Sequence, residues 1–356
     1  MLTVKDLATG NVTNLTPGQQ KKKTVKSKRT QINPRSPLDL LKTVKATTAD
    51  EMAKEIEIDF IAEKRQQWFK DSNENDMENP DHVVVVRTDT DDYLGTVGSD
   101  YGMVQYIDML RFTEELTKAG KAEYLHGGYI GKGEQAFVVM KTDSKVVIGP
   151  GEEIECYFFC STSHNRTKNL SIVPTPYHKK SGTIFMPEIK GAKLAFRHSK
   201  HVHDHLARAR QSHDKVEEYF IHFQKSFNML ASVHLVDAEM ELYLEGLWPL
   251  KGKENTTRTE NVRERVKEIY RTSQSLKFPA TNGTLAGLYM AVCYWADHEQ
   301  IVKKQKVDEE SAKILSSIDD KGAAARRKAE ALATALTLQK KFAEVRERRK
   351  AVANGN

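Results

Sequence analysis

A cysteine and a histidine lie four residues apart in the stretch FFCSTSHNRT (158–167), which raises the question of a nucleophile and its base. Such a pair must meet in space, and a third group must orient the base. Side chains alternate along an extended segment, so Cys156 and Cys160 would share one face. We therefore interpret Cys160 as the last residue of a buried strand and predict no catalytic residue. The polar loop after this strand would contain Ser163, His164, Asn165 and Arg166.

A glycine-rich stretch, HGGYIGKGE (126–134), contains the Gly-Lys step of phosphate-binding loops. Such a loop needs four residues between its first glycine and Gly-Lys, then Ser or Thr, and then a helix. Here three residues separate Gly127 from Gly131, Gly133 follows Lys132, and a strand comes next. The glycines are more typical of a hairpin turn that requires positive φ angles.

Histidines cluster in one part of the chain, because seven of the twelve fall between His164 and His213. The run HVHDH (201–205) would place all three histidines on one face of a strand, or two of them on one face of a helix. The candidate metal ligands are His201, His203 and His205. Solvent-exposed histidines at the start of a helix are the alternative, and no established zinc pattern or other cofactor motif is present.

The elements around these motifs predict an α+β protein. Closely spaced strands with turns and no helix between them, over 122–142, 152–163, 169–178 and 182–189, indicate an antiparallel sheet. Helical periodicity is expected at 36–45 and 49–70, with Thr48 or Asp50 as a cap, and again at 106–120. Apolar positions at helical spacing over 202–233, 261–272, 284–302 and 320–352 predict a helical C-terminal half packed on the sheet.

The domain organisation follows from composition. Residues 1–38 have few large apolar groups, which predicts a flexible basic arm. A single α+β core domain is expected over 39–310, and a basic C-terminal helix with a short tail over 311–356.

Composition and charge restrict the class of protein. Only three cysteines occur, and neither a signal peptide nor an apolar run of about eighteen residues is evident, so a cytoplasmic protein without a membrane partner is expected. Both ends are basic: residues 21–30 hold six basic and no acidic residues, and residues 321–350 hold ten basic and three acidic residues. Residues 71–82 are locally acidic.

Several motifs occur in an order that resembles a known family. STSHNRT followed by LSIVPTPY resembles the "SHDGS…TPVR" region of the phage/plasmid-like proteins grouped as domain of unknown function 932. The same family's motifs are similar to LGTVGSDYGMVQYIDML (94–110), LHGGYIGKGEQAFVVMK (125–141), LAFRHS (194–199), NGTLAGLYMAVCYWADH (282–298) and DDKGAAARRKAEALATAL (319–336). The resemblance covers roughly residues 90–340 and implies a setting in mobile elements beside replication and recombination genes.

The chain also departs from the family pattern. Asn165-Arg166 stands where the family has Asp-Gly, the family's "VC.NTL" stretch is absent around 179–189, and Ala286 replaces a tryptophan. If the replaced residues are catalytic in relatives, this chain has lost them. The resemblance brings no activity with it, so whether the protein is an enzyme stays open, with a non-enzyme favoured.

These features favour a nucleic-acid-binding protein of DNA replication or recombination that binds or anneals single-stranded DNA. The sheet aromatics Tyr124, Tyr129, Phe137, Tyr157 and Phe158 would offer stacking platforms, or else form the core. The expected contacts to phosphate are Ser163, His164, Asn165, Arg166, Lys168, Arg197, Lys200, Arg208 and Arg210, with Lys21, Lys22 and Lys23 in the arm. The alternative is a homo-oligomeric scaffold or virion-associated protein without a catalytic site, and the third hypothesis is a metal-dependent enzyme using the histidines of 164–213.

Overall fold

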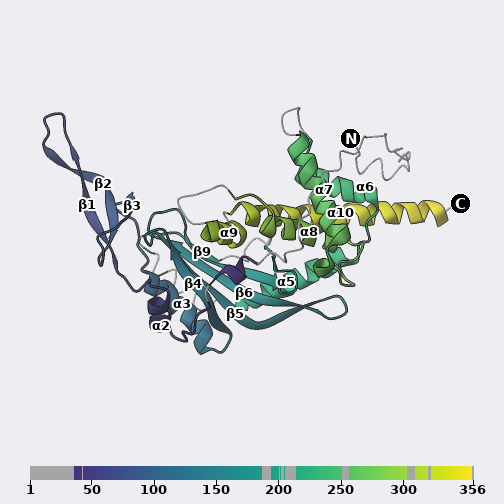
Figure 1. Ribbon diagram of the computed structural model, residues 1–356, viewed down its shortest axis with the longest axis horizontal. Helices are drawn as coiled ribbons and strands as arrows, with labels where there is room; N and C mark the ends of the chain where they lie inside the picture. The colour runs from purple at the N-terminus through teal and green to yellow at the C-terminus, as the bar shows by residue number, and fades with distance from the viewer. Residues whose placement is uncertain are drawn as a thin grey trace.

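The computed structural model of the protein describes residues 36–354 apart from short internal segments (Figure 1). The internal segments outside the described part are 42, 187–193, 200, 202–203, 205–213, 251–255, 303–308 and 320–321. Antiparallel strands fill the first half and helices the second, so the predicted α+β class is confirmed. The arm predicted over residues 1–38 lies outside the described part except for its last three residues.

The larger sheet is antiparallel, with the strand order β4-β5-β6-β7-β8. Its strands are β4 (Ala122–Ile130), β5 (Gln135–Ile148), β6 (Glu152–Ser163), β7 (Leu170–His178), β8 (Thr183–Ile184) and β9 (Leu194–Phe196). β8 and β9 pair with opposite ends of β7. The predicted hairpin turn between β4 and β5 is confirmed, because Gly131 and Gly133 have φ angles of 64° and 107°.

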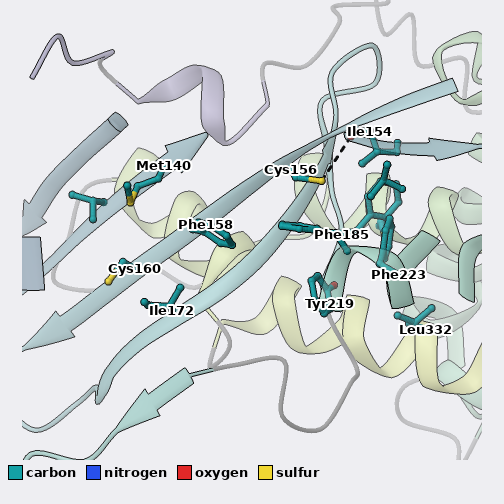
Figure 2. Packing of buried hydrophobic residues seen from close by; sticks show 14 of the residues in the cluster. Met140, Ile154, Cys156, Phe158, Cys160, Ile172, Phe185, Tyr219, Phe223 and Leu332 are labelled. Atoms are coloured by element: carbon teal, nitrogen blue, oxygen red, sulfur yellow. Dashed lines mark hydrogen bonds between the residues drawn. The ribbon is translucent and has the colours of Figure 1, made fainter. Parts of the chain in front are cut away.

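Both faces of this sheet are buried, and β6 shows how. Cys156, Phe158 and Cys160 point to one face and pack in the main core, while Tyr157 and Phe159 point to the other. Figure 2 shows the first set beside Phe185, Tyr219 and Phe223. A strand buried on both faces reads as a continuous apolar run, and the middle of β6, CYFFC (156–160), is such a run.

Helices cover the two faces of the sheet (Figure 1). Their bounds are η1 (Leu38–Leu40), α2 (Ala49–Glu55), α3 (Tyr106–Lys118), α5 (Asp214–Ala231), α6 (Asp237–Leu247), α7 (Thr256–Thr272), η2 (Gln274–Leu276), α8 (Leu285–His298), α9 (Glu309–Ile318) and α10 (Ala323–Asn354). The core on one face includes α2, α3, α5 and α8, whereas η1, α9 and the start of α10 cover the other. α10 packs along α8, and Leu332 and Phe342 join the main core.

The helix predicted over 49–70 is wrong beyond its first two turns. Thr48 caps α2 as expected, but the helix ends at Glu55 and an extended segment leads into β1 (Ala62–Lys70). Glu57 has a φ of 57°, and Ile58 and Phe60 are buried. Alternate burial has a period of two, which is the period of a strand and not of a helix. The helix expected over 36–45 is likewise reduced to η1.

The strand β1 belongs to a second, three-stranded antiparallel sheet with β2 (Asp76–Arg87) and β3 (Tyr93–Gly98). β3 pairs only with residues 82–86 of β2. The remainder of β1 and β2 therefore forms a two-stranded ribbon, which projects at the left of Figure 1.

A buried ion pair links α8 to α10. Lys328 Nζ lies 2.7 Å from Asp297 Oδ1, and neither side chain is exposed to solvent. Asp297 Oδ2 accepts a hydrogen bond of 2.8 Å from the amide of Ile184, and Ser317 Oγ contacts both charged groups. Buried charges need partners to offset the loss of solvent, and these partners come from β8, α8, α9 and α10. The network therefore joins these four elements.

Candidate functional site

A pocket of about 290 Å³ lies between the end of β3, the loop after β6 and the residues after β9. Its lining residues are Gly98, Asp100, Tyr101, Arg166, Asn169, Arg197 and His198. The pocket thus contains two of the arginines predicted to contact phosphate, Arg166 and Arg197.

The pairing of β9 with β7 explains how these segments meet. Leu170 is the register partner of Phe196, so the residues just outside the pair, Asn169 and Arg197, lie next to each other. Arg166 belongs to the loop that leads into β7, which places its side chain at the same end of the strand.

The loop after β6 is held by its own side chains. Ser163 Oγ accepts a 2.9 Å hydrogen bond from the amide of Lys168 and donates to the carbonyl of the same residue. Asn165 Oδ1 accepts from the amide and the hydroxyl of Thr167. Arg166 itself has a φ of 63°, in the left-handed region that favours glycine, and glycine is the residue of the SHDGS motif at this position.

The other wall of the pocket is fixed by His198 and Tyr101. Their rings stack with centroids 4.9 Å apart. His198 Nδ1 lies 3.1 Å from the carbonyl oxygen of Gly102, and Nε2 lies 3.2 Å from Thr162 Oγ1. The Tyr101 hydroxyl donates to the carbonyl of Ser163 at 2.9 Å, so this wall is bonded to the end of β6.

The charges of the pocket are unevenly balanced. Arg166 and Arg197 are both exposed, and neither forms an ion pair or a side-chain hydrogen bond with another described residue. Asp100, also exposed, brings the one carboxylate among the lining residues. Burial lowers the pKa of His198, although its hydrogen bonds to the backbone of Gly102 and Lys168 oppose this effect. The arginines therefore carry the positive charge of the pocket.

His164, predicted as a phosphate contact, is instead an internal residue. Its side chain is 1% exposed, its ring centroid lies 4.1 Å from that of Tyr106, and neither ring nitrogen has a hydrogen-bond partner among the described residues. Burial lowers the pKa of His164 to about 3, with a further contribution from His198. The imidazole is thus neutral at physiological pH and turned away from solvent.

Two other loop residues of the predicted set have internal partners. Ser163 is buried, and its hydroxyl is used by the backbone of Lys168. The ammonium of Lys168 forms an ion pair with Asp319, at the end of α9, and both side chains are largely buried. Asn165 is half-buried and shapes the turn, which leaves Arg166 as the exposed cation of this loop.

The remaining predicted contacts fall mostly outside the described residues. This holds for the predicted phosphate contacts Lys21, Lys22, Lys23, Lys200, Arg208 and Arg210, and for the candidate metal ligands His203 and His205. His201 is exposed, and its Nδ1 lies 3.6 Å from an oxygen of Asp204. In the described part of the chain, no group of three or more His, Cys, Asp or Glu residues is arranged to hold a metal ion.

The sheet aromatics are core residues and not stacking platforms, which corrects that reading of the sequence. Tyr124, Phe137, Tyr157 and Phe158 are buried, and Tyr129 is half-buried beneath Arg87. The four buried rings lie on faces of the sheet that helices cover, so no base could stack on them.

All three cysteines are buried, and Cys160 lies in a buried strand as predicted, but β6 continues to Ser163, so Cys160 is not its last residue. Cys160 is fully buried, and burial raises the pKa of its thiol well above the usual range. Cys156 packs on the same face, and burial raises its pKa to about 12 (Figure 2). A thiol held neutral in this way is a poor nucleophile.

Sequence reasoning missed part of the pocket. Gly98, Asp100, Tyr101, Asn169 and His198 were not among the predicted contacts. No local pattern of the sequence places residues 98–101 beside 197–198; the structure does so through hydrogen bonds of Gly102 to His198 and of Tyr101 to Ser163.

Comparison with known proteins gives a family and no activity. The family model described as Domain of unknown function (DUF932) matches residues 93–318, which includes the whole pocket. No curated protein and no solved structure matches the chain. Among the described helices, none is both long enough and apolar enough to cross a membrane. The match spans more than half of the sequence, so the chain belongs to the family of Domain of unknown function (DUF932).

Proposed function

We propose that this protein binds nucleic acid, with single-stranded DNA as the preferred ligand, and that it acts in DNA replication or recombination. The observation that carries the proposal is that Arg166 and Arg197 line one pocket without an ion-pair partner among the described residues. A phosphate group is the ligand that two free guanidinium groups suit best, because each can donate two parallel hydrogen bonds to its oxygens.

The cost of the Arg166 backbone supports a role for this side chain. A non-glycine residue with a left-handed backbone is disfavoured by roughly 1–2 kcal/mol, and such residues cluster at functional sites. Glycine would avoid this cost but would remove the positive charge. The chain has an arginine here despite the cost, which indicates that the charged side chain is used.

The size of the pocket favours a single strand. Its volume of about 290 Å³ suits one phosphate with part of its sugar. A single strand can bend so that one phosphate enters a concave site, whereas the backbone of a duplex stays on a stiff, regular helix. The half-exposed ring of His198, backed by Tyr101, offers a surface for the adjacent sugar or base.

Fluorescence anisotropy with labelled single-stranded and duplex oligonucleotides of equal length tests the proposal. We expect Arg166→Ala with Arg197→Ala to weaken single-strand binding by about tenfold or more, since a hydrogen bond to a charged group contributes roughly 1.5–3 kcal/mol. Asp100→Asn should tighten binding, because it removes the carboxylate beside the phosphate.

The control is Arg258→Ala with Arg271→Ala, in which Arg271 also loses an exposed ion pair with Asp237. Both arginines are exposed on α7, away from β3 and β9 in Figure 1. Equal losses of affinity in the two double variants would show that binding is only diffuse electrostatic attraction. An unchanged affinity of the Arg166→Ala, Arg197→Ala variant would contradict binding at the pocket.

A further inference from the structure

The projecting ribbon of β1 and β2 exposes large apolar side chains near its tip. Trp68 is 58% exposed, Phe69 is 51% exposed and Met77 is 45% exposed. Phe69 is the register partner of Met77, and Trp68 is the partner of Glu78. Neighbouring residues of a strand face opposite sides, so both faces of the ribbon carry an exposed aromatic ring at the same level.

Such a ribbon is poorly stabilised on its own. A two-stranded hairpin is at best marginally stable in water, and this one extends beyond its third strand, β3 (Figure 1). Exposed aromatic side chains in a cluster are typical of the centre of a protein interface. The tip of the ribbon, residues 68–78, is therefore a contact surface.

The charge of this surface selects its partner. Residues 70–82 hold five carboxylates and one lysine, and Glu74 and Glu78 are exposed. Nucleic acid would be repelled, so this surface is distinct from the arginine pocket. The complementary partner must present cations.

The chain itself contains such a complement in the C-terminal part of α10. Residues 340–350 hold six basic and two acidic residues, and Lys340, Lys341 and Arg348 are exposed. The ribbon lies at one end of the long axis of the molecule and the end of α10 at the other (Figure 1). The two surfaces therefore cannot meet within one chain, but they can meet between two copies.

We propose that the tip of the β1–β2 ribbon docks on the C-terminal part of α10 of a second copy of this chain. The contact is head-to-tail: the ribbon of one copy binds α10 of the next. Each assembly therefore keeps a free ribbon at one end and a free α10 at the other, to which further copies can bind. One of the two aromatic rings, Trp68 or Phe69, would pack on α10, surrounded by carboxylate–ammonium pairs. Association should weaken as salt rises, because ion pairs at the rim of an interface are screened.

Sedimentation equilibrium of the full chain at low and high salt tests the proposal. We expect concentration-dependent association at low salt, and a dissociation constant raised about tenfold or more by Trp68→Ser with Phe69→Ser. The control is Ile221→Ser with Ile301→Ser, which removes two exposed apolar side chains elsewhere. A wild-type protein that stays monomeric at every concentration, or equal effects of both pairs, would overturn the proposal.

Charge reversal tests the pairing of the two surfaces. Glu74→Lys with Glu78→Lys leaves residues 70–82 with three lysines and three carboxylates, and Lys340→Glu with Lys341→Glu leaves residues 340–350 with four basic and four acidic residues. Each variant alone has then lost the attraction between its two ends and should fail to associate. An equimolar mixture brings the unchanged ribbon of one variant together with the unchanged α10 of the other, so the two variants should form a heterodimer. No recovery in the mixture would contradict the proposed contact, even if each variant alone is monomeric. DNA binding at the arginine pocket provides a separate readout that both variants fold.

Discussion

Gly95 of β3 lies against the backbone of Asn165, so that a Cβ atom at Gly95 would come within 2.8 Å of both Cα and Cβ of Asn165. Contacts this short are not found between real Cβ atoms and their neighbours, so the loop after β6 would have to move. The smaller sheet thereby sets the position of the loop that carries Arg166.

Gly95→Ala should therefore lower the free energy of unfolding by about 1–3 kcal/mol, the usual cost of overpacking, and should weaken DNA binding as well. Gly128→Ala is the matched control, because a Cβ atom there would lie 3.6 Å from the Phe137 ring, which is ordinary van der Waals contact. Urea denaturation of both variants measures the difference. Equal stability of the two would mean that the loop is free to shift.

Arg166→Gly should separate stability from binding. Glycine accepts the φ of 63° without strain, whereas alanine does not. We expect Arg166→Gly to be more stable than Arg166→Ala by about 1 kcal/mol, and both to lose the same affinity for single-stranded DNA. An alanine variant as stable as the glycine variant would show that the backbone of this turn is not strained.

His164→Leu should make the protein less sensitive to acid. His164 stays neutral in the folded protein down to its pKa of about 3, whereas in the unfolded chain it binds a proton below about pH 6.5. The unfolded state then binds more protons, so stability falls with falling pH by up to about 1.4 kcal/mol per pH unit for this residue.

The measurement is the free energy of unfolding of both proteins between neutral pH and about pH 4.5, well within that window. The variant should show a shallower slope, although not a flat one, because burial also lowers the pKa of His178, His198 and His298. Parallel curves would contradict a neutral, buried His164.

Lys328→Met should be strongly destabilising, by about 3–5 kcal/mol, because it leaves the buried carboxylate of Asp297 without its cation. The double variant that adds Asp297→Asn should lose less than the two single variants together, since the amide oxygen still accepts from Ile184. Lys118→Met, which breaks an exposed pair with Glu114 on α3, should cost only about 0.5 kcal/mol. Thermal denaturation of the wild type and the four variants checks this order, and additive losses from Lys328→Met and Asp297→Asn would contradict a coupled pair.

The sequence predicts the larger sheet better than the first two helices, which were expected over 36–45 and 49–70. The strand β6 is found at the expected residues, and so is the turn glycine pair Gly131 and Gly133. The helix expected over 49–70 fails because the polar residues of β1 have no strand-like alternation, and only its contact with β2 makes them extended.

The pocket could be predicted only in part, for a related reason. The chemistry of Arg166 and Arg197 is visible in the sequence, but their proximity depends on the three-residue strand β9 and its partner β7. Burial of His164 against Tyr106 is likewise a property of packing between α3 and the sheet, which no local pattern contains.

The most direct test of the central claim is the salt dependence of single-stranded DNA binding. Each phosphate neutralised contributes about 0.7 to the slope of log K against log salt for a single strand. If Arg166 and Arg197 share one phosphate, Arg166→Ala with Arg197→Ala should lower the slope by about 0.7, and by about 1.4 if each holds its own. The Arg258→Ala with Arg271→Ala control should leave the slope unchanged. An identical slope for the wild type and the pocket variant would contradict phosphate binding at this pocket.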